Sequence, residues 1–286
     1  MAKFILSAFA DEAGSTLDEQ IRALQEEGIS LIELRGVDGK NVSALTIEEA
    51  QLVKTKLDAA DIRLSALGSP YGKSSLGIPF EEHLALFKHG LELCRVLDCK
   101  RIRMFSFYPA GEADEATRAE VLRRLEIMLD LAEKAGVQLV HENEKGIYGD
   151  DAARNKDLLQ HFGDAKGSRL GFAFDPANFV QCGVNTLDAY DQLHDRITYM
   201  HIKDALMADG AVVSAGHGDG HVAEILRRLN AERDDEIILT VEPHLTVFAG
   251  LKDLQDEDLK HHESYPDSRT AFHAAVTALR GIINQL

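Results

Sequence analysis

The sequence predicts a (β/α)8 barrel, the TIM-barrel architecture, built as a single domain over residues 1–286. Short apolar runs alternate with amphipathic stretches eight times, which is the pattern of repeated strand–helix units. A length of 286 residues is normal for one such barrel, and no linker rich in proline, glycine or serine divides the chain. Parallel strands joined by helices form an open sheet or a closed barrel, and eight uninterrupted units favour the barrel.

The expected strands are short apolar runs bounded by polar or turn-forming residues: 4–8, 30–34, 63–67, 101–105, 137–141, 170–174, 197–201 and 237–241. The expected helices carry apolar residues at helical spacing: 17–27, 46–59, 80–97, 115–135, 152–162, 187–193, 222–229 and 270–283. Thr46 with Glu49 three residues later is a capping-box pattern, which supports the start of the second helix.

Composition narrows the class of partner. The chain has 31 basic and 48 acidic residues, a formal net charge of −17, which argues against nucleic acid and against an anionic membrane surface. A small-molecule ligand fits better. The odd number of cysteines, three, favours reduced thiols in a cytoplasmic protein. The apolar run Phe4–Phe9 meets Asp11 and Glu12 at once, so we expect a first strand rather than a signal peptide.

Polar groups follow four of the expected strands at the point where each strand ends: Glu142, Asp175, His201 and Glu242. The carboxyl ends of the strands form the active-site face of such barrels, so we expect these side chains to converge there. Side chains alternate along a strand. If Asp175 points inward, Phe172 and Phe174 face the helices, and Gly171 and Ala173 face the barrel axis. His141 then points away from the axis as a core histidine.

Three carboxylates and one imidazole at close range favour a bound cation, because like charges a few ångströms apart repel. One divalent metal ion would remove that cost. Oxygen-rich ligands with a single histidine and no thiolate suit Mn²⁺ first, with Mg²⁺, Co²⁺ or Zn²⁺ as alternatives. For any one of these residues the alternative is a buried ion pair or a satisfied histidine.

The four motifs resemble those of a known family: Glu142 in His-Glu-Asn-Glu, Asp175 in Phe-Asp-Pro-Ala-Asn-Phe, His201 in His-Ile-Lys-Asp and Glu242 in Val-Glu-Pro. They are similar to the metal motifs of the sugar phosphate isomerase/epimerase family, the xylose-isomerase-like TIM barrels. The resemblance covers nearly the whole chain. It implies that Glu142 and Glu242 bind the metal and also act as the catalytic acid/base pair, while Asp175 and His201 serve as metal ligands only.

The chain departs from the family pattern at three places. Asn178 stands where many members carry a histidine that touches substrate. Met207 and Tyr148 stand where ketose 3-epimerases carry an arginine and a second glutamate. These departures weaken assignment as a tagatose or psicose epimerase.

Further residues are candidates for substrate binding: Asn178, Lys203, His217 and His244. Lys203 shares the strand face of His201, and either contacts substrate or pairs with Asp204 or another acid. The loop Gly216–Gly220 binds a phosphate, forms a turn that caps the next helix, or brings His217 to the substrate. Sugar contacts or lids are expected near the ends of the second to fourth strands: Arg35, Tyr71, Phe105 and Phe107. The polar stretch 246–268 is a candidate lid or subunit contact.

The resemblance implies a metal-dependent isomerase or epimerase that removes a proton next to the carbonyl of a sugar or sugar phosphate. Three alternatives stay open. An inosose-dehydratase-like lyase would expel a hydroxyl from the same carbanion. A sugar-binding relative would have lost catalysis. An endonuclease-IV-like phosphodiesterase would require more histidine ligands than this set contains. We expect no nucleic acid or membrane partner and regard a homo-oligomer as an open expectation.

Overall fold

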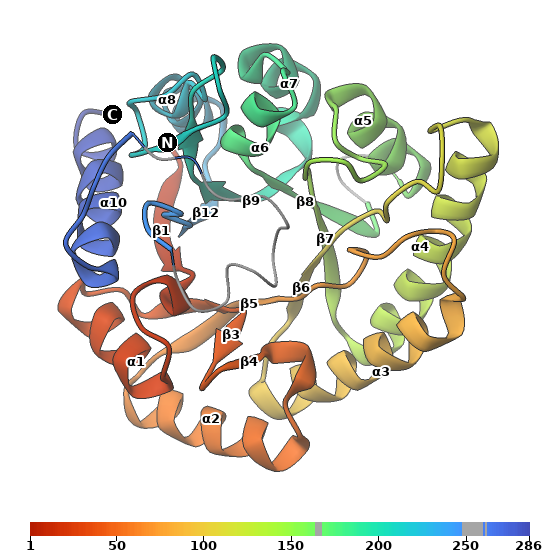
Figure 1. Cartoon of the computed structure of the whole chain (residues 1–286), viewed down its shortest axis with the longest axis horizontal. Coiled ribbons are helices and arrows are strands. Elements are labelled where there is room, and N and C mark those ends of the chain that lie inside the picture. The colour runs from red at the N-terminus through yellow and green to blue at the C-terminus, as the bar shows by residue number, and fades with distance from the viewer. Residues whose placement is uncertain (164–167, 248–259, 261) are drawn as a thin grey trace.

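The computed structural model describes residues 1–163, 168–247, 260 and 262–286. Eight parallel strands close into a barrel in the order β1-β12-β9-β8-β7-β6-β5-β2 (Figure 1). Their bounds are β1 Lys3–Ala8, β2 Leu31–Leu34, β5 Arg63–Gly68, β6 Arg101–Met104, β7 Gln138–Glu142, β8 Leu170–Phe174, β9 Ile197–Ile202 and β12 Glu236–Val241. The predicted (β/α)8 barrel is therefore confirmed.

Helices surround the barrel as an outer ring (Figure 1). Their bounds are α1 Leu17–Glu26, α2 Ile47–Ala59, α3 Phe80–Leu97, α4 Glu115–Ala135, α5 Ala152–His161, α6 Pro176–Gln181, α7 Thr186–Leu193, α8 Val222–Glu232 and α10 Ser268–Ile283. Thr46 and Glu49 form the predicted capping box at the start of α2. Among the described residues, no helix is both long and apolar enough to cross a membrane.

Some short elements at the top of the barrel are absent from the sequence prediction. The 3-10 helix η1 (Ala10–Glu12) follows β1, and α6 follows β8 directly. The loops also contain two small two-stranded sheets. One pairs β3 (Gly36–Val37) with β4 (Lys40–Asn41), and the other pairs β10 (Asp204–Ala205) with β11 (Val212–Val213). The predicted lid or subunit contact at 246–268 falls largely on residues outside the described part of the chain.

The core forms two layers that follow the predicted alternation of side chains. Phe172 and Phe174 belong to the large apolar layer between strands and helices. Ala173 instead packs with Val140 and Tyr199 inside the barrel. His141 is fully buried and stacks on Phe172, with ring centroids 6.5 Å apart. Burial lowers the pKa of His141 to about 3, so the ring is a neutral histidine of the core, but neither ring nitrogen has the hydrogen-bond partner expected of a satisfied histidine among the described residues.

Candidate metal centre

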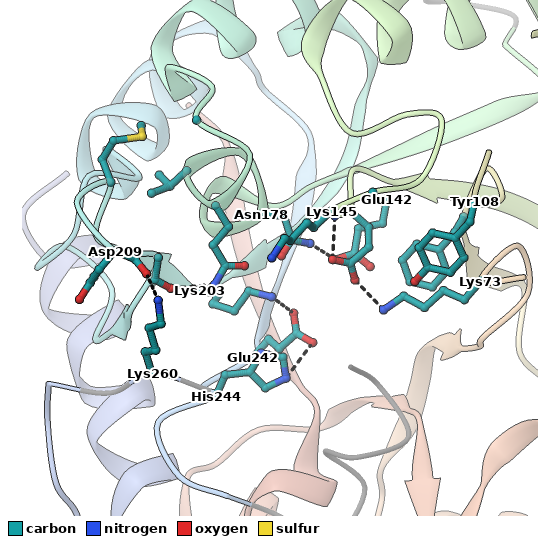
Figure 2. Close-up of a pocket in the computed structure, with 18 of the residues that line it drawn as sticks. Lys73, Tyr108, Glu142, Lys145, Asn178, Lys203, Asp209, Glu242, His244 and Lys260 are labelled. Carbon is teal, nitrogen blue, oxygen red and sulfur yellow. Dashed lines mark hydrogen bonds and ion pairs between the residues drawn. The ribbon is translucent and has the colours of Figure 1, made fainter. Parts of the chain in front are cut away.

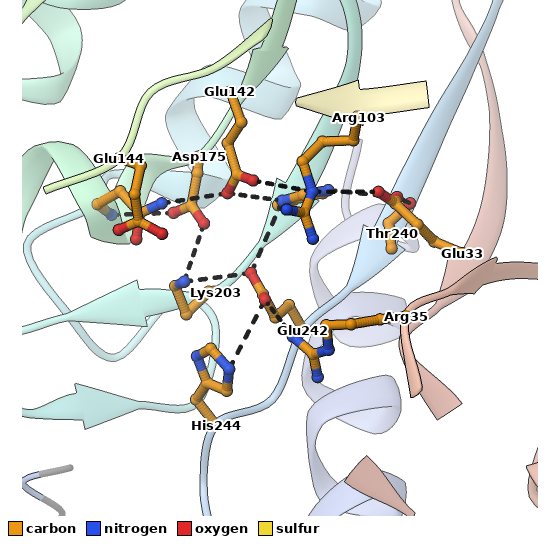
Figure 3. Close-up of polar contacts among 12 residues, drawn as sticks. Glu33, Arg35, Arg103, Glu142, Glu144, Asp175, Lys203, Thr240, Glu242 and His244 are labelled. Atoms are coloured by element: carbon orange, nitrogen blue, oxygen red, sulfur yellow. Dashed lines mark hydrogen bonds and ion pairs between the residues drawn. The ribbon is translucent and has the colours of Figure 1, made fainter. Parts of the chain in front are cut away.

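Four predicted ligands meet at the carboxyl ends of neighbouring strands β7, β8, β9 and β12: Glu142, Asp175, His201 and Glu242. Each offers one ligand-type atom, and these four atoms all lie within 4.8 Å of one another. All four side chains are buried. Figure 3 shows Glu142, Asp175 and Glu242 converging from different strands. The structure therefore brings together the residues that were separated by up to 100 positions in the sequence.

The orientation of His201 is set by two carboxylates on opposite sides of its ring. His201 Nδ1 lies 2.9 Å from Glu142 Oε1, and Nε2 lies 3.2 Å from Oε2 of Glu33 on β2. Glu33 also accepts hydrogen bonds from the hydroxyls of Tyr199, at 2.9 Å, and Thr240, at 3.1 Å. Burial alone would lower the pKa of His201, but Glu142 and Glu33 raise it well above its usual value. Glu33 thus points Nδ1 of His201 toward the other ligands.

Asp175 directs one carboxylate oxygen toward Glu142, His201 and Glu242. Its Oδ1 caps helix α6 by accepting from the backbone N–H of Asn178 at 2.9 Å. Its Oδ2 is buried and makes no hydrogen bond within the described part of the chain, and lies 3.1 Å from Nζ of Lys203. Burial raises the pKa of Asp175 to about 7; Lys203 opposes this shift and the Glu142 charge adds to it. The Asn178 amide donates to Glu142 Oε1 at 3.1 Å, so it holds a predicted ligand in place.

Three side-chain cations contact the acidic ligands; the sequence analysis expected an acid partner for Lys203 but missed the pairing of Arg35 and Arg103 with these ligands. Arg35 Nη1 lies 2.8 Å from Glu242 Oε1, and Lys203 Nζ lies 3.1 Å from Glu242 Oε2. Arg103 Nε, on β6, lies 3.2 Å from Glu142 Oε2. Burial would raise the pKa of Glu242, but Lys203 and the neighbouring histidines and arginine lower it well below its usual value. Arg35, predicted as a sugar contact or lid, is a buried partner of carboxylates and also lines the cavity beside this cluster.

The set of donors fits a divalent metal ion. Asp175 Oδ2 is a buried carboxylate oxygen without a hydrogen bond among the described residues, and the Lys203 ammonium, 3.1 Å away, offsets part of the cost of its burial. Glu142 Oε1 and His201 Nδ1 face each other, and Glu242 Oε2 lies 3.7 Å from the same ring nitrogen. Three carboxylates and one imidazole suit Mn²⁺, Mg²⁺, Co²⁺ or Zn²⁺. The contact of His201 with Glu33 supplies the outer partner that metal-binding histidines normally have.

A cavity of about 690 Å³ opens above these residues, with Glu142 and Glu242 in its lining. Three of the predicted substrate contacts, Asn178, Lys203 and His244, also line it (Figure 2). Lys203 lines the cavity, where its contact with a substrate stays a prediction, and it pairs with the acids Asp175 and Glu242 rather than with Asp204. A volume of this size accommodates a small metabolite.

His217, the fourth predicted substrate contact, lies apart from this cavity. Its side chain is 67% exposed, and Nδ1 lies 3.5 Å from Glu263 Oε1. The cavity lining does not include it. The structure therefore does not bring His217 together with the other predicted site residues.

The glycine-rich loop 216–220 surrounds an internal carboxylate. The buried side chain of Asp204 accepts backbone N–H groups from Gly216 at 2.9 Å, Gly218 at 3.1 Å and Gly220 at 2.8 Å. A Cβ atom at Gly218 or Gly220 would lie only 2.4 or 2.6 Å from Asp204 Oδ1, so the close approach requires glycine. The alternative of a phosphate site loses its support, because the N–H groups that would bind it are already engaged.

Comparisons with known proteins agree with the fold. The family model described as xylose isomerase-like TIM barrel matches residues 21–265. A comparison with curated protein sequences gives no match. Similar solved structures include an IolI protein with a bound zinc atom, at 16% identity and a TM-score of 0.73, covering 99% of this chain and 98% of that one.

Two further solved structures have related folds. The probable 3-DHS dehydratase AsbF from Bacillus anthracis is 15% identical with a TM-score of 0.72, covering 98% of this chain and 99% of that one. A D-allulose 3-epimerase from Methylomonas sp. is 15% identical with a TM-score of 0.71, covering 100% of both chains. At these identities the likeness concerns the fold. The family match over most of the sequence shows that the chain belongs to the xylose isomerase-like TIM barrel family.

Proposed function

We propose that this protein is a divalent-metal-dependent isomerase or epimerase of a small sugar or sugar phosphate, with Mn²⁺ as the first candidate ion. The observation that carries the proposal is the cluster of four ligand atoms within 4.8 Å, next to a cavity lined by both glutamates. When bound, the ion would supply charge that stabilises the negative oxygen formed by proton loss next to a carbonyl. Glu142, Asp175, His201 and Glu242 would hold it.

The side chains around the cavity would carry out proton transfer and substrate binding. Glu142 ends β7, Glu242 directly follows β12, and both line the cavity, so one can take a proton and the other can return one. The Lys203 ammonium, 3.1 Å from Glu242 Oε2, is placed to donate to a substrate oxygen. Asn178 holds Glu142 through its amide and also lines the cavity. Because Met207 and Tyr148 stand where ketose 3-epimerases carry an arginine and a second glutamate, the proposal does not extend to that specific reaction.

A lyase is the second candidate. It would use the same carbanion and expel a neighbouring hydroxyl group as water. The buried Lys203 ammonium favours this possibility, because a cation in the cavity wall can stabilise a departing oxygen. The shared fold with a probable 3-DHS dehydratase is consistent with it. Product analysis separates the two candidates, since a lyase gives a dehydrated product and an isomerase gives none.

The test is incorporation of solvent deuterium into a panel of ketoses and ketose phosphates, with metal content measured on the same samples. Glu142→Gln and Glu242→Gln should each reduce exchange at least 100-fold, the scale expected for loss of an acid or base group. Glu144→Gln is the matched control, because Glu144 also lines the cavity but pairs with Lys73, at 2.6 Å, outside the metal cluster. Exchange at near-normal rates in either of the first two variants would remove that glutamate from the acid/base role.

A further inference from the structure

A second group of ligand-type atoms adjoins the first and shares one residue with it. Glu12, Glu242 and His244 each offer one atom, and these atoms lie within 4.8 Å of one another. Glu12 belongs to η1 after β1, and His244 follows β12. His244 Nε2 lies 3.5 Å from Glu12 Oε1 and 3.6 Å from Glu242 Oε1. Two carboxylates and an imidazole are the kind of donor set that binds Mn²⁺ or Zn²⁺.

The same two carboxylate oxygens are already bound by a guanidinium group. Arg35 Nη2 lies 2.9 Å from Glu12 Oε1. Arg35 Nη1 lies 2.8 Å from Glu242 Oε1 (Figure 3). Both atoms are the ones nearest to His244 Nε2. An ion at this position would have to share them with a fixed positive charge, since arginine keeps its proton under ordinary conditions.

Arg35 is held rigidly in this place. Its Nε and Nη2 form a two-pronged contact with the Asp11 carboxylate, at 2.9 and 3.0 Å. Its guanidinium lies 4.3 Å from the ring centroid of Phe9, and the side chain is buried. Withdrawal of Arg35 would break ion pairs to three acids at once, so a second metal ion cannot easily displace it.

We propose that Arg35 acts as an internal cation at what would otherwise be a second metal position, and so restricts the centre to one ion. The guanidinium also occupies Glu242 Oε1, while Oε2, which accepts from Lys203 Nζ at 3.1 Å, is the oxygen of Glu242 that faces the first cluster. This inference rests on the proposed metal centre but is independent of the substrate and of the reaction. Removal of the guanidinium would create a pair of ions bridged by Glu242.

The experiment counts bound Mn²⁺ in the folded protein by titration with elemental analysis, and records electron paramagnetic resonance spectra. We expect one Mn²⁺ per wild-type chain with the spectrum of an isolated ion. Arg35→Gln should bind two, with the spectrum of an exchange-coupled pair, because Glu242 would bridge them. Arg35→Lys should still bind one, since it keeps the positive charge. The double variant Arg35→Gln/Glu12→Gln should return to one, because it lacks a ligand for the second ion.

The outcomes separate the two proposals. Binding of no Mn²⁺ by the wild type would overturn the metal centre itself. Two ions in the wild type, or only one in folded Arg35→Gln at saturation, would overturn the role of Arg35 while leaving the first site intact. Should Arg35→Gln not fold, Asp11→Asn/Arg35→Gln carries one acid fewer and keeps the three ligands. It should also bind two ions, and a single ion there would refute the inference.

Discussion

Glu33→Gln tests whether Glu33, which is not one of the four candidate ligands, orients the ring of His201. Glu33 is fully buried in β2, and its Oε2 lies 3.2 Å from Nε2 of His201. The carboxylate keeps Nε2 as the hydrogen-bond donor, so Nδ1 faces Glu142 at 2.9 Å and is the nitrogen offered to a metal ion. The amide is nearly the same size but carries no charge and can donate as well as accept. The variant therefore weakens the orientation of His201 without leaving a cavity.

The expected loss is in metal affinity. Replacing such an outer partner of a metal-binding histidine costs roughly 10–100-fold in affinity, or about 1.4–2.7 kcal/mol. Isothermal titration with Mn²⁺ measures it directly, and circular dichroism verifies that the barrel remains folded. The fall in affinity should accompany a fall in deuterium exchange at fixed Mn²⁺, which additional metal partly restores.

Tyr199→Phe is the matched control for this variant. The Tyr199 hydroxyl donates to the other oxygen of Glu33, Oε1, at 2.9 Å, so its removal leaves the contact with His201 in place. We expect less than a threefold change in Mn²⁺ affinity for the control. Equal affinities of Glu33→Gln and wild type, with both folded, would show that Glu33 does not orient the metal ligand.

Two more predictions concern buried groups outside the metal centre. Asp204→Asn removes the charge that four backbone N–H groups surround, so unfolding in urea should show a loss of about 3 kcal/mol; a loss below about 0.5 kcal/mol would contradict the role of Asp204 in the loop. His141 has a pKa lowered to about 3, so the unfolded chain binds more protons than the folded one below pH 6.5 and stability falls as pH falls. At pH 5 His141 should account for about 2 kcal/mol of lost stability relative to pH 8, a difference that His141→Gln should remove; an unchanged pH dependence in the variant would refute it.

The barrel could be predicted because strand and helix periodicities are local. The eight predicted strands match the observed ones within about two residues at each end. Helix α6 was missed, although Asp175 as the N-cap with Pro176 after it is a helix-start signal. The strand pairs β3–β4 and β10–β11 have only two residues in each strand, too few to show a period.

The cluster of candidate metal ligands could be predicted because each member stands at the end of a strand, and parallel strands end on one face. Their surroundings could not, because these contacts join distant parts of the chain. Glu33 and His201 are 168 positions apart, and the pairing of Arg35 with Glu242 spans 207. The sequence nevertheless contains a feature that indicates such buried contacts. Glu33 and Arg103 are charged residues within short strands of otherwise mostly apolar sequence, which marks them as residues with buried partners.

Two motifs of this chain have the donors of an ion-binding site but are already neutralised by a charged side chain of the protein itself. The glycine-rich loop has the backbone donors of an anion site, but Asp204 provides the anion. Glu12, Glu242 and His244 have the donors of a cation site, but Arg35 provides the cation. The cluster of Glu142, Asp175, His201 and Glu242 differs in its donor set, because four ligand-type atoms lie within 4.8 Å of one another there, against three at Glu12, Glu242 and His244. Three carboxylates and one imidazole are the larger set of metal donors, and this is the physical reason to expect an external ion there and not at the other two places.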